Sequence, residues 1–301
     1  MLARLTRLLF LAHVAALVGL LWLGATRGWS AGAAIGLAAL LLWHPVVLGI
    51  ECLLMRRVTQ RVNGTRVPAG RLLRAWLGEW RASSVTFAWR LPWRSSAEPD
   101  HLPPAARGSR GVVFVHGFVC NRGFWNPWLA RLRALDRAFV AVSLEPVFGG
   151  IDDYATIVEA AVRRVEAATG VPPLVVAHSM GGLAVRGWLR AFASQGAAER
   201  VAEIVTIGTP HRGTWLASLG LSPNARQMRQ GSAWMSALAA ADPAPQAARF
   251  VCWWSDCDQI VFPPPTAVLP GAQSRAIEGA AHIALCFREE VWEDLLARLE
   301  G

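Results

Sequence analysis

One serine of the sequence lies in a setting that indicates nucleophilic chemistry. Residues 175–182 read VVAHSMGG, so an apolar, β-branched run leads through Ser179 into glycines that can open a helix. A sharp strand-to-helix turn strains the backbone of its serine and requires small residues two positions away on each side, which Ala177 and Gly181 provide. The turn lifts the hydroxyl above the sheet at the positive end of the helix. We therefore predict Ser179 as the nucleophile.

Two histidines follow Ser179 and compete for the role of general base. A serine hydroxyl attacks an ester near neutral pH only when a base takes its proton and a carboxylate fixes the tautomer of that base. With this kind of turn the order along the chain is serine, acid, histidine. His282 lies in a Gly/Ala loop before the last predicted helix, and we predict it as the base. His211 comes too early in the chain, so we interpret it as structural.

The acid is expected directly after a predicted strand over residues 250–254, where Asp256 and Asp258 both qualify. Asp258 is followed by the apolar residues of an IVF segment, which can anchor the loop in the core. We predict Asp258 as the acid and keep Asp256 as the alternative.

Two backbone N–H groups are predicted to hold the negative charge that develops on the carbonyl oxygen. One belongs to Met180, the residue after the nucleophile, and the other to Phe118, in the loop after a predicted strand that ends at His116-Gly117. We interpret His116 as a buried residue that fixes this loop by hydrogen bonds, in preference to a proton-transfer role.

These residues fall on a chain in which strands and helices alternate from residue 111 onward. The predicted strands cover residues 111–115, 138–144, 174–177, 203–207 and 250–254. The predicted helices cover residues 125–135, 152–168, 183–193 and 289–299. Short apolar strands that alternate with helices indicate a mostly parallel sheet with helices on both faces. Residues 214–248 form an apolar insertion between two core strands, which we interpret as a short cap over an acyl group.

Residues 111–301 resemble the α/β-hydrolase superfamily, and in particular bacterial triacylglycerol lipase-like esterases. The segments that carry the resemblance are VFVHGF at 113–118, AHSMGG at 177–182, GTPHRGT at 208–214, SDCDQIV at 255–261 and GAAH at 279–282. The resemblance implies the α/β-hydrolase fold and a triad of Ser179, Asp258 and His282. It also implies a lipase or carboxylesterase activity that uses no cofactor.

The first 57 residues are predicted to anchor the chain in a membrane. Residues 8–24 and 31–50 are uncharged runs, each near the roughly 17–25 residues that a spanning helix needs. The alternatives are a cleaved signal peptide, which lacks a small-residue cleavage site here, and a single anchor followed by a buried or re-entrant segment. Arginines flank both ends of the pair, and only Arg27 lies in the link, so both ends are predicted to be cytoplasmic. The expected location is the bacterial inner membrane, with the catalytic domain on the cytoplasmic side.

Residues 58–110 are predicted to be a juxtamembrane connector. A helix from Pro68 to about Ala82 gathers Leu72, Leu73, Trp76, Leu77 and Trp80 on one face, which is typical of an interfacial helix or of a helix that packs on the next domain. Residues 83–90 are predicted to form a strand, and residues 98–110 a linker rich in proline, alanine and glycine.

Charge and cysteine usage exclude several other classes of protein. The formal net charge of +9 comes almost entirely from residues 1–100, which carry 12 arginines against 4 acidic residues. This excess lies beside the most hydrophobic sequence, so membrane topology explains it better than nucleic-acid binding does. The five cysteines have no repeating spacing, which excludes a disulfide scaffold and a zinc framework, and we expect no metal site.

We therefore predict a membrane-anchored serine ester hydrolase that acts on lipid or small-molecule esters. Two alternatives stay open: an acyltransferase or thioesterase that uses the same triad, and a non-catalytic membrane-bound protein that keeps the hydrolase fold for binding.

Overall fold

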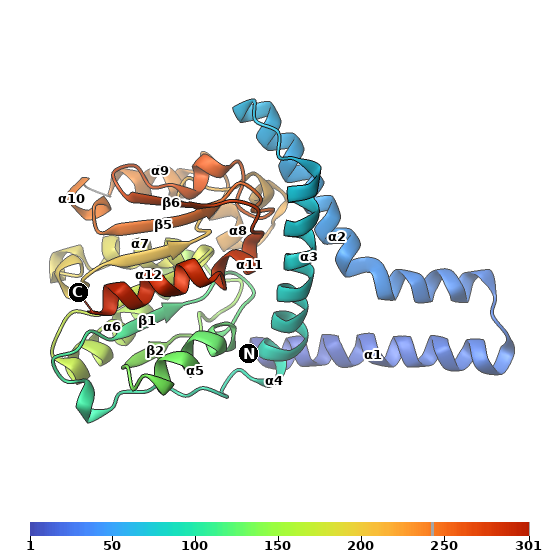
Figure 1. Ribbon diagram of the computed structural model, residues 1–301, viewed down its shortest axis with the longest axis horizontal. Helices are drawn as coiled ribbons and strands as arrows, with labels where there is room; N and C mark the ends of the chain where they lie inside the picture. Colours follow the sequence, from blue (N-terminus) through green and yellow to red (C-terminus); the bar gives the residue numbers. More distant parts are fainter. Residues whose placement is uncertain (242–243, 301) are drawn as a thin grey trace.

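The computed structural model describes residues 1–241 and 244–300. For residues 244 and 245 it describes the backbone alone. It consists of a sheet with helices on both faces and a pair of long N-terminal helices that project from it (Figure 1). A further helix, α3 (Ala69–Val85), lies between these two parts and runs across the direction of the pair (Figure 1).

The sheet has six parallel strands in the order β2-β1-β3-β4-β5-β6. The strands are β1 (Val112–Val115), β2 (Phe139–Ala141), β3 (Leu174–His178), β4 (Ile204–Ile207), β5 (Phe250–Ser255) and β6 (Gln273–Ile277). Every residue of β1 to β4 is buried, because helices cover both faces of the sheet. The five predicted strands are confirmed, and β6 is an edge strand that the prediction missed.

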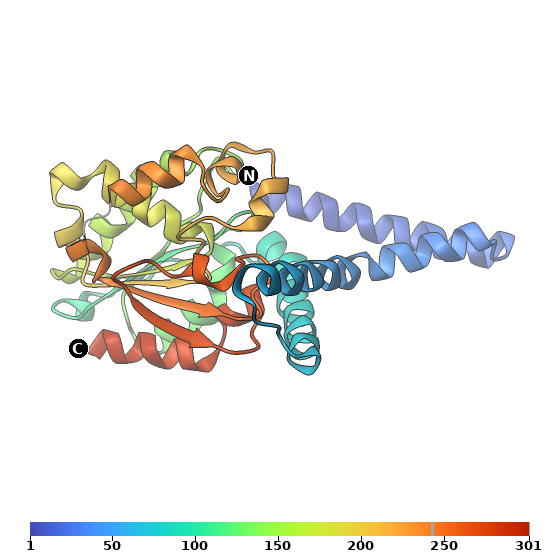
Figure 2. The same cartoon turned by 90° about the horizontal axis from the view of Figure 1, so that it is seen from above.

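Two apolar layers hold the helices against the sheet. On one face, α6 (Ala155–Thr169) and α7 (Met180–Ala191) bury residues such as Val158 and Trp188. On the other face, α5 (Asn126–Ala134) and α12 (Glu289–Glu300) meet through Trp128 and Trp292, whose ring centroids lie 5.5 Å apart. The red C-terminal helix α12 is seen below the sheet in Figure 2. This arrangement confirms the predicted α/β architecture.

Short helices complete the body. They are α4 (Leu91–Trp93), α8 (Pro223–Gln227), α9 (Ala233–Ala240), α10 (Ala244–Ala247) and α11 (His282–Cys286). Helices α8 to α10 occupy the insertion predicted over 214–248, of which residues 242–243 lie outside the described part of the chain.

The two N-terminal helices are α1 (Leu2–Arg27) and α2 (Ala31–Asn63), and both are long and apolar enough to cross a membrane by length and composition. They run side by side and away from the sheet (Figures 1 and 2). Helix α2 continues 13 residues beyond the predicted end at residue 50. Helix α2 bends along its length in Figure 1. Pro45 lies inside the helix, and a proline is a usual cause of such a bend.

The N-terminus returns to the body at the loop that follows β2. The Met1 ammonium group lies 2.6 Å from the Glu145 carboxylate, and the Leu2 side chain is buried. The start of α1 therefore lies at the body. The second half of α2 lies there as well, since Cys52 and Met55 pack in one cluster with Phe262. The link between the two helices lies at the far end of the pair (Figure 1).

Helix α3 packs on the body with one face and exposes the other. Leu72, Ala75, Glu79 and Ser83 are buried, whereas Leu73, Leu77 and Trp80 remain exposed. The Trp76 indole donates a hydrogen bond of 2.8 Å to the Pro45 carbonyl oxygen, which joins α3 to α2.

The strand predicted over residues 83–90 is wrong. Helix α3 extends to Val85 and continues as a π-helical turn over Thr86–Arg90, which leads into α4. Ser83 and Thr86, three positions apart and therefore on one side of this helical segment, are both buried. Packing against the body therefore outweighs the β propensity of the Val-Thr-Phe segment.

Candidate active site

Ser179 stands at the turn that joins β3 to α7, with a backbone φ of 56° and ψ of −131°. A non-glycine residue rarely adopts this conformation, and the surrounding contacts hold it there. The Ser179 N–H donates to the Ile207 carbonyl oxygen at 2.9 Å, and the Thr209 hydroxyl donates to the Ser179 carbonyl oxygen at 2.9 Å. A Cβ on Gly181 would lie 2.5 Å from the Val115 carbonyl oxygen, so the turn requires glycine there.

His282 and Asp258 meet at the carboxyl end of the sheet. The Asp258 Oδ2 atom lies 2.9 Å from Nδ1 of His282, and both side chains are buried. The Asp258 Oδ1 atom accepts hydrogen bonds from the N–H groups of Ile260 at 2.9 Å and Val261 at 2.8 Å, which fixes the carboxylate. Nδ1 of His282 therefore carries the proton, and Nε2 is left to act as a base.

Burial and nearby carboxylates have opposite effects on the pKa of His282. Burial lowers the pKa of His282, but the Asp258 carboxylate and, at longer range, Glu79 and Glu51 outweigh that effect. The pKa of His282 therefore lies above its ordinary value of 6.5.

The serine turn and the histidine loop are neighbours in space. The His178 ring, one residue before Ser179, lies 4.5 Å from the His282 ring between centroids. The same His178 ring stacks on Phe124 at 4.7 Å. Ser179 is 7% exposed and His282 5% exposed, so both lie beneath the surface of the body. The structure thus brings all three predicted triad residues to one region.

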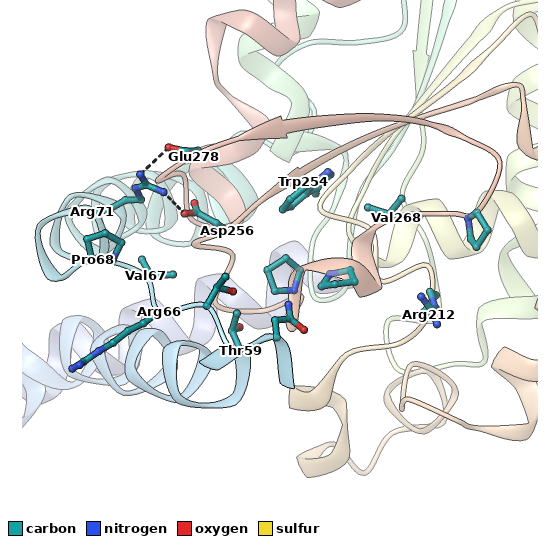
Figure 3. A pocket seen from close by; sticks show the side chains of 15 residues that line it. Thr59, Arg66, Val67, Pro68, Arg71, Arg212, Trp254, Asp256, Val268 and Glu278 are labelled. Carbon is teal, nitrogen blue, oxygen red and sulfur yellow. Dashed lines mark hydrogen bonds and ion pairs between the residues drawn. The ribbon is translucent and has the colours of Figure 1, made fainter. Parts of the chain in front are cut away.

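Asp256, the alternative acid, has other partners. Its Oδ1 atom accepts the Gly279 N–H at 2.8 Å, and its Oδ2 atom lies 2.7 Å from the Arg71 guanidinium of α3. Figure 3 shows this ion pair together with the one between Arg71 and Glu278, at 2.8 Å. The Arg71 ion pair and the Gly279 hydrogen bond tie the loop after β5 to α3 and to the loop after β6.

The loop with the predicted oxyanion donor Phe118 approaches Ser179, because a Cβ on the neighbouring Gly117 would lie 2.7 Å from Ser179 Cβ. Met180 is the first residue of α7, and Phe118 follows the end of β1. The chain turns sharply there, because Val119 has a φ of 52°. His116 is 1% exposed; its Nδ1 lies 2.8 Å from the Gly117 carbonyl oxygen, and its Nε2 accepts the Leu144 N–H at 2.9 Å. Burial lowers the pKa of His116 to about 4, so the neutral ring fixes this loop.

Residues 112–299 match the family model described as "Alpha/beta hydrolase family". The chain belongs to the alpha/beta hydrolase family. Among solved structures, the mature lipase BlEst2 of Bacillus licheniformis is similar in fold, with a TM-score of 0.56 and 18% identity, over 67% of this chain and 95% of that one. Lipase B of Aspergillus fumigatus gives a TM-score of 0.55 and 18% identity, over 64% of this chain and 53% of that one. The comparison with curated proteins finds no match.

His211 of this hydrolase domain is buried, and the hydrogen-bond partners described for it lie outside the candidate triad. Its Nε2 lies 2.9 Å from the Thr206 hydroxyl, and its carbonyl oxygen accepts a hydrogen bond of 2.7 Å from Arg186. Burial and the nearby guanidinium lower the pKa of His211 well below its ordinary value. These contacts agree with a structural role.

A groove of about 650 Å³ lies at the junction of α2 and α3 with the loops after β5 and β6 (Figure 3). Among the described residues that line it are Arg66, Arg71 and Arg212, whereas Ser179 and His282 are not lining residues. The groove is therefore separate from the candidate triad.

Sequence reasoning missed two residues that contact the triad loops. Gln259 accepts the His282 N–H at 3.0 Å and donates to Glu79 of α3 at 3.0 Å. The available signal was that Glu79 is the one acidic residue between positions 52 and 97, in a segment rich in arginine and apolar residues.

Proposed function

We propose that the protein is a membrane-anchored serine hydrolase that cleaves carboxylic esters with an apolar acyl group. Ser179 is the nucleophile, His282 the base and Asp258 the acid. The observation that carries this proposal is the 2.9 Å contact between Asp258 Oδ2 and His282 Nδ1, beside a serine held in a strained turn. A buried carboxylate, an imidazole and a serine hydroxyl in this order are the parts that acyl transfer to serine requires.

The reaction proceeds in two halves. Ser179 Oγ forms a bond to the ester carbonyl carbon while Nε2 of His282 takes the hydroxyl proton. The N–H groups of Met180 and Phe118 donate to the resulting oxyanion. The carbon–oxygen bond to the alcohol then breaks, and the imidazolium returns its proton to that alcohol. Water attacks the acyl-enzyme in the same way, so that the acid leaves and the serine hydroxyl is restored.

Apolar side chains around the carboxyl edge of the sheet support an apolar acyl group. The Phe118 ring, in the predicted oxyanion loop, contacts Phe148 with 5.9 Å between centroids, and Phe148 is half exposed. Leu219 and Leu221 of the insertion after β4 are exposed as well. Loops with exposed apolar residues at the rim of a site favour an acyl chain over a polar substrate.

The N-terminal pair supports anchoring in a bilayer. Its large apolar side chains are mostly exposed, unlike those of a core helix in a soluble protein. The start of α1 and the second half of α2 lie at the body and carry arginines, whereas the far end of the pair carries only Arg27, the last residue of α1. By the positive-inside rule the hydrolase domain then lies on the cytoplasmic side of the bacterial inner membrane. Helix α3 lies between the sheet and the pair in Figure 1. Its exposed residues Leu73, Leu77 and Trp80 support a contact of this helix with lipid.

Hydrolysis of a panel of p-nitrophenyl esters of increasing acyl length, by the purified full chain in detergent, tests the proposed activity. We expect the wild type to release nitrophenol and the Ser179→Ala variant to show no activity above the buffer rate. Equal activity in the two proteins would contradict the assignment.

Protease treatment of sealed vesicles tests the orientation. In inverted vesicles of the inner membrane the hydrolase domain is expected to be digested, and in right-side-out vesicles it is expected to be protected. Protection in inverted vesicles would place the domain on the opposite side.

A further inference from the structure

A carboxylate that the proposed mechanism does not use lies directly beneath the catalytic loops. Glu79 of α3 is 1% exposed and belongs to the connector, outside the part of the chain that matches the family model. An ionisable side chain is costly to bury unless hydrogen bonds satisfy it. The partners of Glu79 therefore indicate what it does.

One set of partners belongs to the loop that carries the base. Ile283 N donates to Glu79 Oε2 at 2.9 Å and to Oε1 at 3.0 Å, and Ala284 N donates to Oε2 at 3.0 Å. These are the two residues that follow His282 in the first turn of α11. The Glu79 carboxylate thus fixes the backbone directly after His282, and with it the position of the His282 imidazole.

The other partner belongs to the loop that carries the acid. Gln259, next to Asp258, donates from Nε2 to Glu79 Oε1 at 3.0 Å, and its Oε1 accepts the His282 N–H at 3.0 Å. Glu79 and Gln259 therefore close a hydrogen-bonded ring that links the acid loop, the base loop and α3. Two turns earlier on α3, Arg71 adds the ion pairs with Asp256 and Glu278 that Figure 3 shows.

We infer that Glu79 is a positioning residue through which the membrane-proximal helix α3 sets the geometry of the His282–Asp258 pair. This inference rests on the proposed function of that pair. Helix α3 turns its exposed apolar face away from the body, so the element that meets the bilayer is also the element that holds the catalytic loops. A rigid support of this kind matters because a displacement of about 1 Å can cost about 100-fold in rate.

The hydrogen-bond donors and the charges around Glu79 agree with a positioning role for this residue. Burial raises the pKa of Glu79, whereas the Ala284 N–H and the nearby His282 favour its ionised form. Each hydrogen bond described above has a Glu79 oxygen as acceptor, which fits a carboxylate. Other titratable groups that act on this site are Asp258 in the acid loop and Glu51 and Cys52 on α2.

The test compares the full chain in detergent with its Glu79→Gln, Glu79→Asp and Glu159→Gln variants. Glu159 of α6 is the matched control, because it is also a buried carboxylate with several donors, Trp188 at 2.7 Å and Arg163 at 2.5 Å among them, in the layer around α6 and α7. Two quantities are measured: the titration of the His282 imidazole by NMR of labelled histidine, and kcat and KM for a short-chain ester. The NMR titration does not depend on the protein being active, and circular dichroism reports folding of each variant.

Glu79→Gln removes a negative charge that favours the imidazolium, so the titration of His282 is expected to move to lower pH. Its amide also points an N–H group at backbone donors, so kcat is expected to fall by about tenfold or more with little change in KM. Glu79→Asp keeps the charge but shortens the side chain. It is expected to keep the titration of His282 close to that of the wild type and to lose kcat, and it serves as the second variant where Glu79→Gln does not fold. Glu159→Gln is expected to change neither quantity.

A folded Glu79→Gln protein whose His282 titration matches that of Glu159→Gln would overturn the inference. So would a kcat equal to that of the wild type in either Glu79 variant. If the wild type hydrolyses no ester, the proposed function fails. The NMR titration then still decides whether Glu79 acts on His282.

Discussion

Replacement of Asp258 by asparagine tests the electrostatic arrangement of the triad with almost no change in side-chain volume. Asp258 Oδ1 accepts the N–H groups of Ile260 and Val261, so the oxygen of an asparagine at this position is held toward those two donors. Its amide NH₂ group then takes the place of Oδ2 and faces Nδ1 of His282, which lies 2.9 Å from Oδ2 in the wild type.

This arrangement forces the other tautomer of the imidazole. Nδ1 has to accept a hydrogen bond from the amide N–H, so the ring proton lies on Nε2, which then cannot take a proton from Ser179. In a serine triad this change lowers kcat by about 10⁴-fold, which corresponds to ~5 kcal/mol of transition-state stabilisation. We expect a loss of that order for Asp258→Asn near neutral pH.

The matched control is Asp256→Asn. Asp256 binds Arg71 and the Gly279 N–H, and its side chain is 24% exposed, so its ion pair is partly screened by solvent. We expect this variant to keep kcat within about threefold of the wild type, since partly exposed ion pairs contribute little. The assay is the initial rate of ester hydrolysis, with thermal unfolding measured to compare stability. The reasoning is refuted if Asp256→Asn loses activity while Asp258→Asn keeps it.

Three further outcomes follow from the site and the core. Because the base has to be neutral and the pKa of His282 lies above 6.5, kcat/KM is expected to fall as the pH drops through a midpoint above 6.5; a pH-rate profile with a midpoint well below that value would contradict the raised pKa. A Cβ on Gly208 (φ 56°) would lie 3.0 Å from Asp258 Oδ2 and 3.2 Å from His282 Nδ1. Gly208→Ala is therefore expected to lower both the rate and, by about 1–3 kcal/mol, the stability, whereas Gly108→Ala, with φ 81° and open space around it, is expected to lower stability only. All five cysteines are buried, and burial raises the pKa of Cys120 to about 12, so Ellman's reagent is expected to titrate five thiols only after denaturation; rapid reaction of the native protein would count against this packing.

The sequence predicts the parts of this fold that have a strong local signal. The apolar strands and the serine turn were found because a fully buried parallel strand and a strained turn each restrict the residues at known positions. His282 and Asp258 could be predicted as base and acid because the order of such a triad along the chain limits the candidates to a few residues.

Features that depend on packing between distant segments were not predictable in this way. Strand β6 has the sequence QSRAI, whose first four residues are exposed or half exposed, so no apolar pattern marks it. The helix over residues 83–85 and the π-helical turn after it exist because their buried face meets the body. Glu79 is an isolated acidic residue between positions 52 and 97, where no pattern marks it. Only the fold brings it into contact with the backbone of Ile283, 204 positions further along the chain.

The central claim is that Ser179 is an activated nucleophile, and covalent labelling with a fluorophosphonate probe tests it most directly. Mass spectrometry of the labelled full chain in detergent is expected to find one phosphonyl adduct on the peptide that contains Ser179, and none in Ser179→Ala or in heat-denatured protein. Absence of labelling in the folded wild type, or equal labelling of Ser179→Ala, would contradict the account.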